Sequence, residues 1–343
     1  MPPTAAFRAP VCSAAMRTPP FSGRSRTDLR WRWGAPLVAV ALVVVAGCST
    51  SSSGAPTGSG AGLHPSTSVT TAAPTTTAAP TTTTTTEQPG WTQVSTVGGA
   101  IAVDQRAFTE PDGHLITVVR FRAPSVTYAL HVGSTDPPRG QATIGPDAGP
   151  AIGPDEAPYL LAAFNGGFNS KDGGSGFEIN GQVLVPLQAG LASLVIDADG
   201  SARVGVWGQG LPAPGEQVVS VRQNLPPLVA GGQPSANIGD IGAWGATLGG
   251  GSVVARSSLG QDAAGNLLYA AGMAALPADL AGALVAAGAV DGMQLDINPE
   301  WVQLAFAPAA GGPLSIAIPG QNRPADQYQT GWTRDFVTVL ARH

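Results

Sequence analysis

Short apolar runs separated by turn residues dominate residues 91–343, and this pattern predicts strands. Asp199-Gly200 lies between two such runs and indicates a β-hairpin. The clearest helix is expected at residues 277–287, with proline in the first turn, Asp279 soon after it and Gly288 beyond the end. The strands that we expect are 115–122, 126–132, 159–164, 191–197, 202–207, 225–229, 246–248, 252–257, 266–271, 290–295, 302–307, 314–318 and 335–341.

Many expected strands and few helices favour an α+β fold, with one strand-rich domain that contains few helices. No alternation of strands and helices supports a Rossmann sheet. We expect a signal peptide at 1–47, a disordered linker at 48–90 and a single domain at 91–343.

The N-terminus has the pattern of a targeting segment. Basic residues up to Arg32 precede an apolar run at 37–45 that is too short to span a bilayer comfortably. Small residues and Cys48 follow, which resembles a bacterial lipobox. We therefore expect Cys48 to be lipidated and the protein to be anchored on the extracytoplasmic face of the cell membrane. An ordinary secretion signal or an uncleaved anchor helix is the alternative, and the start is either Met1 or Met16.

Residues 48–90 are rich in Ser, Thr, Pro and Ala and contain almost nothing that can be buried. Such a segment cannot offset the entropy that is lost on ordering. We expect a disordered stalk between the membrane and the domain.

Charge and cysteine content narrow the function classes. The chain has 343 residues, a net charge of -5 and 11% charged residues, and several of its arginines precede the apolar run. A nucleic-acid partner is therefore not expected. The cysteines are Cys12, which cleavage would remove, and Cys48, so no disulfide is expected in the domain.

Polar groups gather at three strand ends. Asn165-Gly166-Gly167 follows the buried run at 159–164, which suits either a site at a sheet edge or a hairpin turn. Arg256 lies among glycine and hydroxyl residues, and its planar fork suits phosphate or carboxylate, although an ion pair with Asp262 is equally open. Asp296 ends another apolar run, where a carboxylate often serves only as a cap.

These three segments together resemble the phosphodiester glycosidase family, whose members include N-acetylglucosamine-1-phosphodiester alpha-N-acetylglucosaminidase-like domains. The matching segments are AAFNGGF at 162–168, ARSSLGQDAAGNLLY at 255–269 and the helix-to-strand passage at 280–296. Residues 115–132 and 224–232 are similar to the family's opening strands and middle segment, so the resemblance covers nearly all of 110–343.

The chain departs from the family after Leu295-Asp296. The family's glycines and serine are replaced here by the segment from Ile297 to Trp301. Those glycines would let backbone amides face an anion, and proline, which has no N–H, cannot do the same. Either the substrate differs, with Glu300 or Trp301 reaching the site, or the activity is lost.

The resemblance implies a hydrolase that cleaves a sugar from a glycosyl phosphodiester at the cell envelope, without a cofactor. Arg256 and the amides of Gly166 and Gly167 would clamp the anion, because such a reaction needs fixed donors for the phosphate. Asp296 would be the catalytic carboxylate and Glu178 the second choice, with retention or inversion left open. Asn165 and Asp262 would orient the substrate or brace Arg256.

Other classes fit less well. His114 and His131 are the only internal histidines of the domain, and both lie in strand-like runs, so we expect surface histidines and no metal site. Neither EF-hand spacing nor a Gly-x-Ser-x-Gly elbow is present. The main rival is a non-catalytic envelope lipoprotein that binds cell-wall glycan. Its sugar-stacking residues would be Trp244, Trp301 and Trp332, unless these tryptophans belong to the core.

Overall fold

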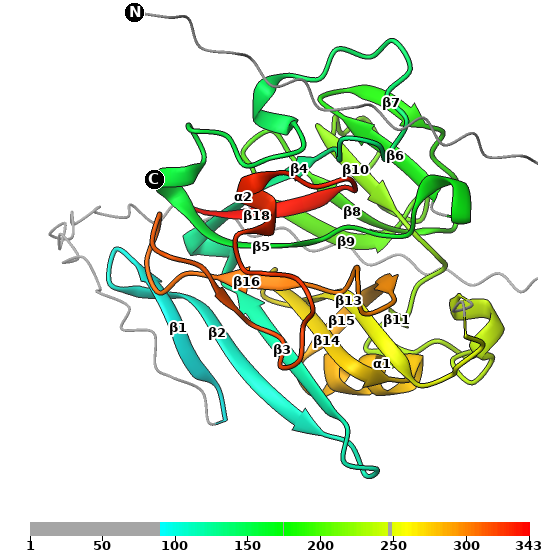
Figure 1. Cartoon of the computed structure of the whole chain (residues 1–343). Helices are drawn as coiled ribbons and strands as arrows, with labels where there is room; N and C mark the ends of the chain where they lie inside the picture. The colour runs from blue at the N-terminus through cyan, green and yellow to red at the C-terminus, as the bar shows by residue number, and fades with distance from the viewer. Residues whose placement is uncertain (1–89, 174, 246–248) are drawn as a thin grey trace, which may run out of the picture. The chain divides into compact units, whose positions relative to one another are not determined.

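The structure is a computed structural model that describes residues 90–173, 175–245 and 249–343. The expected signal peptide, the lipidated Cys48, the linker and the expected strand at 246–248 lie outside the described residues. The described residues form three sheets in which every pair of neighbouring strands is antiparallel (Figure 1).

The first sheet has eight strands in the order β1-β2-β3-β14-β13-β15-β11-β12. At its centre, β13 lies between β14 and β15, so segments that are distant in sequence become neighbours. The strands are β1 (Thr92–Val97), β2 (Ala100–Thr109), β3 (Leu115–Phe121), β11 (Val229–Ala230), β12 (Gln233–Pro234), β13 (Val254–Asp262), β14 (Leu267–Ala275) and β15 (Ala289–Ile297).

The other two sheets have five strands each, in the orders β7-β6-β10-β8-β9 and β17-β16-β5-β18-β4. In the second of them, the last strand of the chain, β18, is inserted between β5 and β4. The strands are β4 (Val126–His131), β5 (Leu160–Asn165), β6 (Ser175–Ile179), β7 (Gln182–Val185), β8 (Ala192–Ile196), β9 (Ala202–Val206), β10 (Ser220–Gln223), β16 (Leu304–Phe306), β17 (Ser315–Ile316) and β18 (Phe336–Ala341).

The main core lies where the three sheets meet. Val119 and Tyr269 of the eight-stranded sheet pack in one cluster with Phe164 of β5 and Ile179 of β6. Phe164 stacks on Phe121 with ring centroids 5.8 Å apart. The apolar residues of these strands therefore fill a shared interior, which fixes the ends of β5, β15 and β18 relative to one another.

Helix α1 (Pro277–Ala286) covers another face of the eight-stranded sheet, where Leu280 and Leu284 pack against Val118 and Leu268. Its start is fixed by Asp279, whose Oδ2 accepts the Leu276 N–H at 2.7 Å. The prediction of this helix is confirmed. No helix of the described residues is long and apolar enough to cross a membrane.

The expectation of an α+β fold needs correction. Besides α1, the described residues contain only the short α-helix α2 (Gln327–Thr330), so the fold is mostly β. The hairpin at Asp199-Gly200 is confirmed between β8 and β9, with Gly200 at φ +76°. The strand expected at 225–229 is wrong except at its end, since Pro226 and Pro227 offer no N–H to a ladder. The sequence pattern missed β1, β2, β6, β7, β10 and β12.

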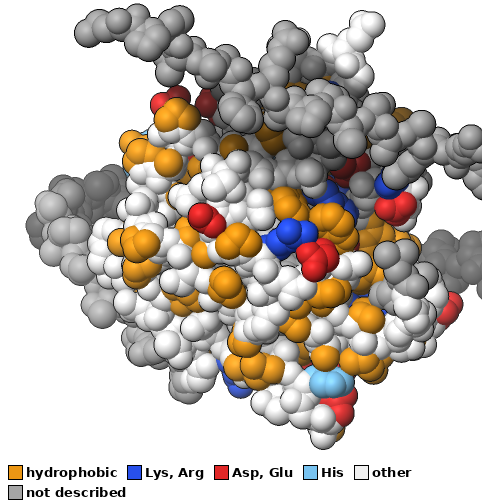
Figure 2. Space-filling view, in the orientation of Figure 1, with side chains coloured by type: hydrophobic (Ala, Val, Ile, Leu, Met, Phe, Trp, Pro, Cys, Tyr) orange, Lys and Arg blue, Asp and Glu red, His pale blue; other side chains and the backbone are white. Residues whose placement is uncertain are grey.

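The described part of the face drawn in Figure 2 carries few charged side chains. Basic and acidic groups lie next to each other near its centre, and no large area of a single charge is visible on it. This agrees with the low content of charged residues, 11% of the chain.

Candidate functional site

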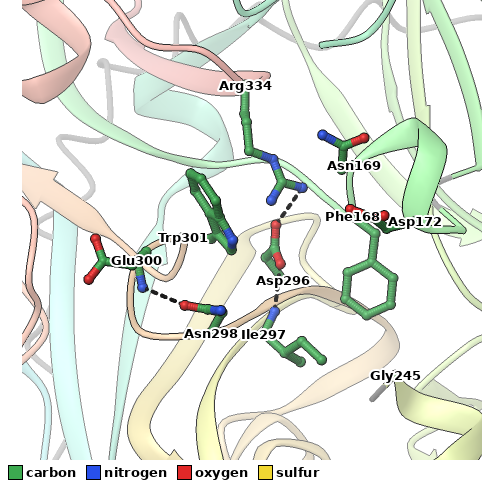
Figure 3. Close-up of a pocket in the computed structure, with 10 residues that line it drawn as sticks. All are labelled: Phe168, Asn169, Asp172, Gly245, Asp296, Ile297, Asn298, Glu300, Trp301 and Arg334. Atoms are coloured by element: carbon green, nitrogen blue, oxygen red, sulfur yellow. Dashed lines mark hydrogen bonds and ion pairs between the residues drawn. The ribbon is translucent and has the colours of Figure 1, made fainter. Parts of the chain in front are cut away.

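A pocket of about 560 Å³ opens where β15, the loop after β5 and the segment before β18 come together (Figure 3). This volume is within the range of small-molecule sites. Its wall is formed by Phe168, Asn169, Asp172, Gly245, Asp296, Ile297, Asn298, Glu300, Trp301 and Arg334.

Asp296 lies in the middle of these side chains, between Trp301 and Phe168 (Figure 3). It is only 4% exposed. Its Oδ1 accepts the Ile297 N–H at 2.7 Å, and its Oδ2 lies 2.8 Å from Nη2 of Arg334. Its own N–H donates to Ser257 Oγ on β13 at 3.1 Å, which ties the end of β15 to the neighbouring strand. The carboxyl group is therefore held in one orientation.

Burial raises the pKa of Asp296 from 3.8 to about 7. The Arg334 charge and the Ile297 N–H act against this rise of the pKa, whereas the charge of Asp335 adds to it and Arg222 lowers it slightly. A carboxyl group with a pKa near 7 can exchange a proton at neutral pH, which general acid–base catalysis requires.

Arg334 is the basic group of the pocket, and its side chain is 9% exposed. Its Nη2 donates to the carbonyl of Gly167 at 2.8 Å as well as facing Asp296. Its guanidinium carbon lies 4.7 Å from the ring centroid of Trp301. No described residue bonds to Nε or Nη1, and neither atom is fully buried. These N–H groups are available to the oxygen atoms of a ligand.

A buried ion pair supports the pocket from behind. Arg222 on β10 donates to Asp335 with Nε at 2.7 Å and with Nη2 at 3.3 Å, and Nη2 also donates to the carbonyl of Phe168 at 2.6 Å. Gly166 lies against this pair: a Cβ atom there would be 1.8 Å from Asp335 Oδ2. The two glycines after β5 thus allow the ion pair to approach the backbone closely.

The predicted anion clamp differs from what the structure places here. The Gly166 N–H donates to the Asp335 carbonyl at 3.0 Å, and both Gly166 and Gly167 are buried. Asn165 is also buried, with Nδ2 donating to Ser257 Oγ at 3.0 Å and Oδ1 accepting the Tyr269 hydroxyl at 2.7 Å. These residues join β5 to β13 and β14 instead of lining the pocket.

Arg256 does not line the pocket and is 0% exposed. Its Nη1 donates to the carbonyl of Trp244 at 3.0 Å and to Gln294 Oε1 at 3.3 Å, and burial lowers its pKa to about 10. The ion pair with Asp262 that the sequence left open is not formed. Asp262 is at the other end of β13, where its Oδ1 accepts the Asn266 N–H at 2.9 Å and holds a turn.

Glu178 lies on β6 and does not line the pocket. Burial raises its pKa. Of the residues that the sequence singled out, the structure brings Asp296, Ile297, Glu300 and Trp301 to the pocket wall. Asn165, Gly166, Gly167 and Arg256 lie behind that wall, and Glu178 and Asp262 are not part of it.

The turn after β15 is built on Asn298, which has φ +100°. Its Oδ1 accepts the Glu300 N–H at 3.0 Å, and its carbonyl accepts the Trp301 N–H at 3.0 Å. The carboxylate of Glu300 points away from Asp296 in Figure 3 and pairs with Arg323 at 2.6 Å. The segment from Ile297 to Trp301 thus gives the pocket an aromatic wall.

The aromatic and histidine residues are placed differently from what the sequence indicated. Trp244 and Trp332 are 1% and 9% exposed and belong to the core, so only Trp301 lines the pocket. The surface position expected for His131 is wrong: it is 0% exposed, and its Nε2 lies 3.0 Å from Glu156 Oε2. Within the described residues, no group of three or more His, Cys, Asp or Glu side chains is placed to hold a metal ion.

Sequence reasoning missed Arg334, Asp335 and Arg222, as well as Asn224, whose Nδ2 donates to the Gln294 and Leu295 carbonyls at 2.7 and 2.6 Å. One signal was present: Arg334 and Asp335 stand directly before the terminal apolar strand in a chain with few charges. Charged residues at a strand end in such a chain are candidates for a buried pair.

No family model matches the chain, and no curated protein matches it in sequence. Among solved structures, the catalytic domain of zebrafish N-acetylglucosamine-1-phosphodiester alpha-N-acetylglucosaminidase, auto-inhibited by its pro-peptide, is 14% identical with a TM-score of 0.44, covering 74% of this chain and 88% of that chain. A hypothetical protein from Synechocystis is 15% identical with a TM-score of 0.40, covering 71% of this chain and 63% of that one. A protein from Burkholderia pseudomallei described as exported is 10% identical with a TM-score of 0.28, covering 71% and 75%. At these TM-scores the similarities assign neither a family nor an activity to this chain.

Proposed function

We propose that this protein is a hydrolase that cleaves a sugar from a glycosyl phosphodiester. The observation that supports this most directly is the pair of Asp296 and Arg334 in a pocket of ligand size, with the pKa of Asp296 raised to about 7. A titratable carboxyl group beside a cation with free donors suits a substrate that carries both an anomeric carbon and a phosphate.

Arg334 takes the role of phosphate ligand in this proposal. Its Nε and Nη1 groups have no partner among the described residues, and a guanidinium binds phosphate oxygens in pairs. Asn169 and Asn298 on the pocket wall offer amide groups to sugar hydroxyls. The family motif that ends in Asn165-Gly166-Gly167 supports the same substrate class, with these residues, Arg256 and Asp262 acting as structural support.

The proposed reaction breaks the bond between the anomeric carbon and the phosphate oxygen. Water adds to the carbon, the bonding electron pair leaves with the phosphate, and ionised Asp296 takes the proton from the water or stabilises the positive charge on the sugar. The products are the free sugar and a phosphate monoester of the remaining alcohol. The leaving phosphate is already an anion that Arg334 can stabilise, so little proton donation to it is needed.

We also propose that the protein acts at the cell envelope, held to the outer face of the membrane by a lipid on Cys48 and spaced from it by residues 48–90. Nucleic acid is not part of this proposal. Labelling of the expressed protein with a radioactive fatty acid, which the Cys48→Ser variant should lose, tests the anchor. Equal labelling of the two proteins would refute it.

The catalytic proposal is tested by turnover of an N-acetylglucosamine 1-phosphodiester and of bacterial wall fractions by the purified protein. We expect Asp296→Asn to abolish sugar release, because Asn cannot accept the proton. Arg334→Gln should raise KM and lower kcat, since the phosphate loses its partner. Glu178→Gln is the matched control and should keep wild-type turnover, because Glu178 does not line the pocket. Sugar release that persists in Asp296→Asn would refute the assigned role.

The competing function is binding of cell-wall glycan without catalysis. One observation favours it: the segment that departs from the family places the Trp301 ring on the pocket wall. Such a protein would bind wall fragments in calorimetry and would release no sugar from any of the substrates above. Binding together with turnover would exclude it.

A further inference from the structure

The Trp301 ring contacts two other side chains. The guanidinium carbon of Arg334 lies 4.7 Å from its centroid, and the centroid of the Trp332 ring lies 5.7 Å away, with the two ring planes at an angle of 58°. Trp332 in turn carries the guanidinium of Arg323 at 4.8 Å from its centroid. A continuous row of cations and indole rings therefore leads from the half-exposed Arg323 to the buried Asp296.

Trp301 contacts Arg334, the residue that we propose as the phosphate ligand. Because the guanidinium of Arg334 lies over its ring, that area of the indole is not open to a sugar. A cation over an aromatic ring is attracted by the ring's negative face, and the attraction is largest where water is excluded. The side chain of Arg334 is only 9% exposed, so little water weakens the attraction between its guanidinium and the Trp301 ring.

We propose that Trp301 is a positioning residue, which holds the guanidinium of Arg334 against Asp296 and keeps its remaining N–H groups turned to the ligand. Without the ring, Arg334 would be fixed only through Nη2, to Asp296 and the Gly167 carbonyl, and could rotate about that nitrogen. The inference rests on the proposed function only for the identity of the ligand.

The turn at Asn298 sets the position of the ring. Its carbonyl accepts the N–H of Trp301, and the neighbouring Glu300 is tied to Arg323 and to Asn322 Nδ2, at 2.6 and 2.9 Å. The ring is therefore fixed from its own backbone as well as by Trp332. Replacement of the family's glycines and serine in this segment thus supplies a support for Arg334.

The titration of Asp296 reports on this arrangement, because Arg334 lowers the pKa of Asp296. If Arg334 moves away, the pKa of Asp296 must rise further. A substitution at Trp301 changes none of the other titratable groups near Asp296. Arg222 and Asp335 act on the pKa of Asp296, Tyr269 is coupled to it, and Asp172 and Glu300 line the same pocket.

The experiment follows the carboxyl carbon of Asp296 by NMR in the purified protein with labelled aspartate, assigned with Asp296→Asn, across pH 4–10. We expect Trp301→Leu, which removes the ring, to raise the midpoint by about one pH unit, a tenfold change in proton affinity. Trp301→Phe keeps an aromatic face and should shift the midpoint less and in the same direction. Tyr159→Leu, at an exposed ring that stacks on His343 outside the pocket, is the matched control and should shift nothing.

An unchanged midpoint in Trp301→Leu would overturn the inference. If that variant does not fold, Trp301→Phe decides: a rise of the midpoint supports the inference and a wild-type midpoint overturns it. The proposed function is judged separately, by turnover in the wild type. If the wild type shows no turnover but Trp301→Leu still shifts the midpoint, the proposed function is refuted and the positioning role of Trp301 stands. If the wild type is active and the midpoint does not shift, the positioning role is refuted and the proposed function stands.

Discussion

The glycine pair after β5 allows a sharp test of the packing behind the pocket. In Gly166→Ala, the new Cβ would lie 1.8 Å from Oδ2 and 2.4 Å from Cγ of Asp335. The carboxylate must then move by more than about 1 Å to reach an acceptable contact, which takes it out of hydrogen-bond range of Arg222. Asp335 is 1% exposed, and so both charges would remain buried without each other.

We expect Gly166→Ala to lower the free energy of unfolding by about 3–5 kcal/mol, the usual cost of separating a buried ion pair. Urea unfolding followed by tryptophan fluorescence measures this as a lower midpoint at an unchanged slope. Gly282→Ala is the matched control, since Gly282 is within α1 and a Cβ there meets nothing within 4 Å. This control should raise stability by about 0.5–1 kcal/mol. A loss below about 1 kcal/mol in Gly166→Ala would show that Asp335 is free to move.

Three further predictions follow from the same region. The pKa of Asp296 is raised from 3.8 to about 7 in the folded state, so protonated Asp296 stabilises the fold. This contribution to the free energy of unfolding is complete below pH 4 and is lost as the pH rises through 7. Chemical unfolding from pH 4 to 8 should show that Asp296→Asn lacks this fall in the free energy of unfolding, and the same dependence on pH in both proteins would contradict the prediction. Asn298, at φ +100°, should tolerate Gly far better than Ala, with a difference of about 1 kcal/mol or more in unfolding free energy in favour of Gly, and equal stabilities would argue against strain there. Asp335→Ala should cost about 3–5 kcal/mol in unfolding free energy and Arg323→Ala less than about 1 kcal/mol, because the first breaks a buried pair and the second a half-exposed one; equal losses would refute the distinction.

Local features of the fold were predictable because local physics determines them. The apolar runs at 115–122 and 126–132 correspond to β3 and β4, and the run at 159–164 to β5. The proline and Asp279 at the start of α1 also act within a single turn. The length of the short edge strand β17 was overestimated, because the extent of pairing with its neighbour, and not residue type, decides where such a strand ends.

The candidate site was predictable only in part. Asp296 could be singled out because it ends a buried strand, but its partner Arg334 follows 38 residues later and reaches it only through the insertion of β18 beside β5. Arg256 has residue neighbours that suit an anion, yet the pairing of β13 with β15 buries it completely. Asp296 reaches the pocket and Arg256 does not because of the register between strands that are distant in sequence, and a single sequence does not reveal this register.

The position of β18 affects when the sheet can form during translation. β4 and β5 emerge early, but the strand that pairs with both of them consists of residues 336–341, at the end of the chain. Their hydrogen-bonding edges must wait for nearly the whole domain to be translated, which makes folding slow and exposes unpaired edges to other chains meanwhile. Arg334 and Asp335 arrive in the same final stretch. A chain that ends before residue 332 would therefore lose β18 from between β5 and β4, together with Arg334 and Asp335, in a single step.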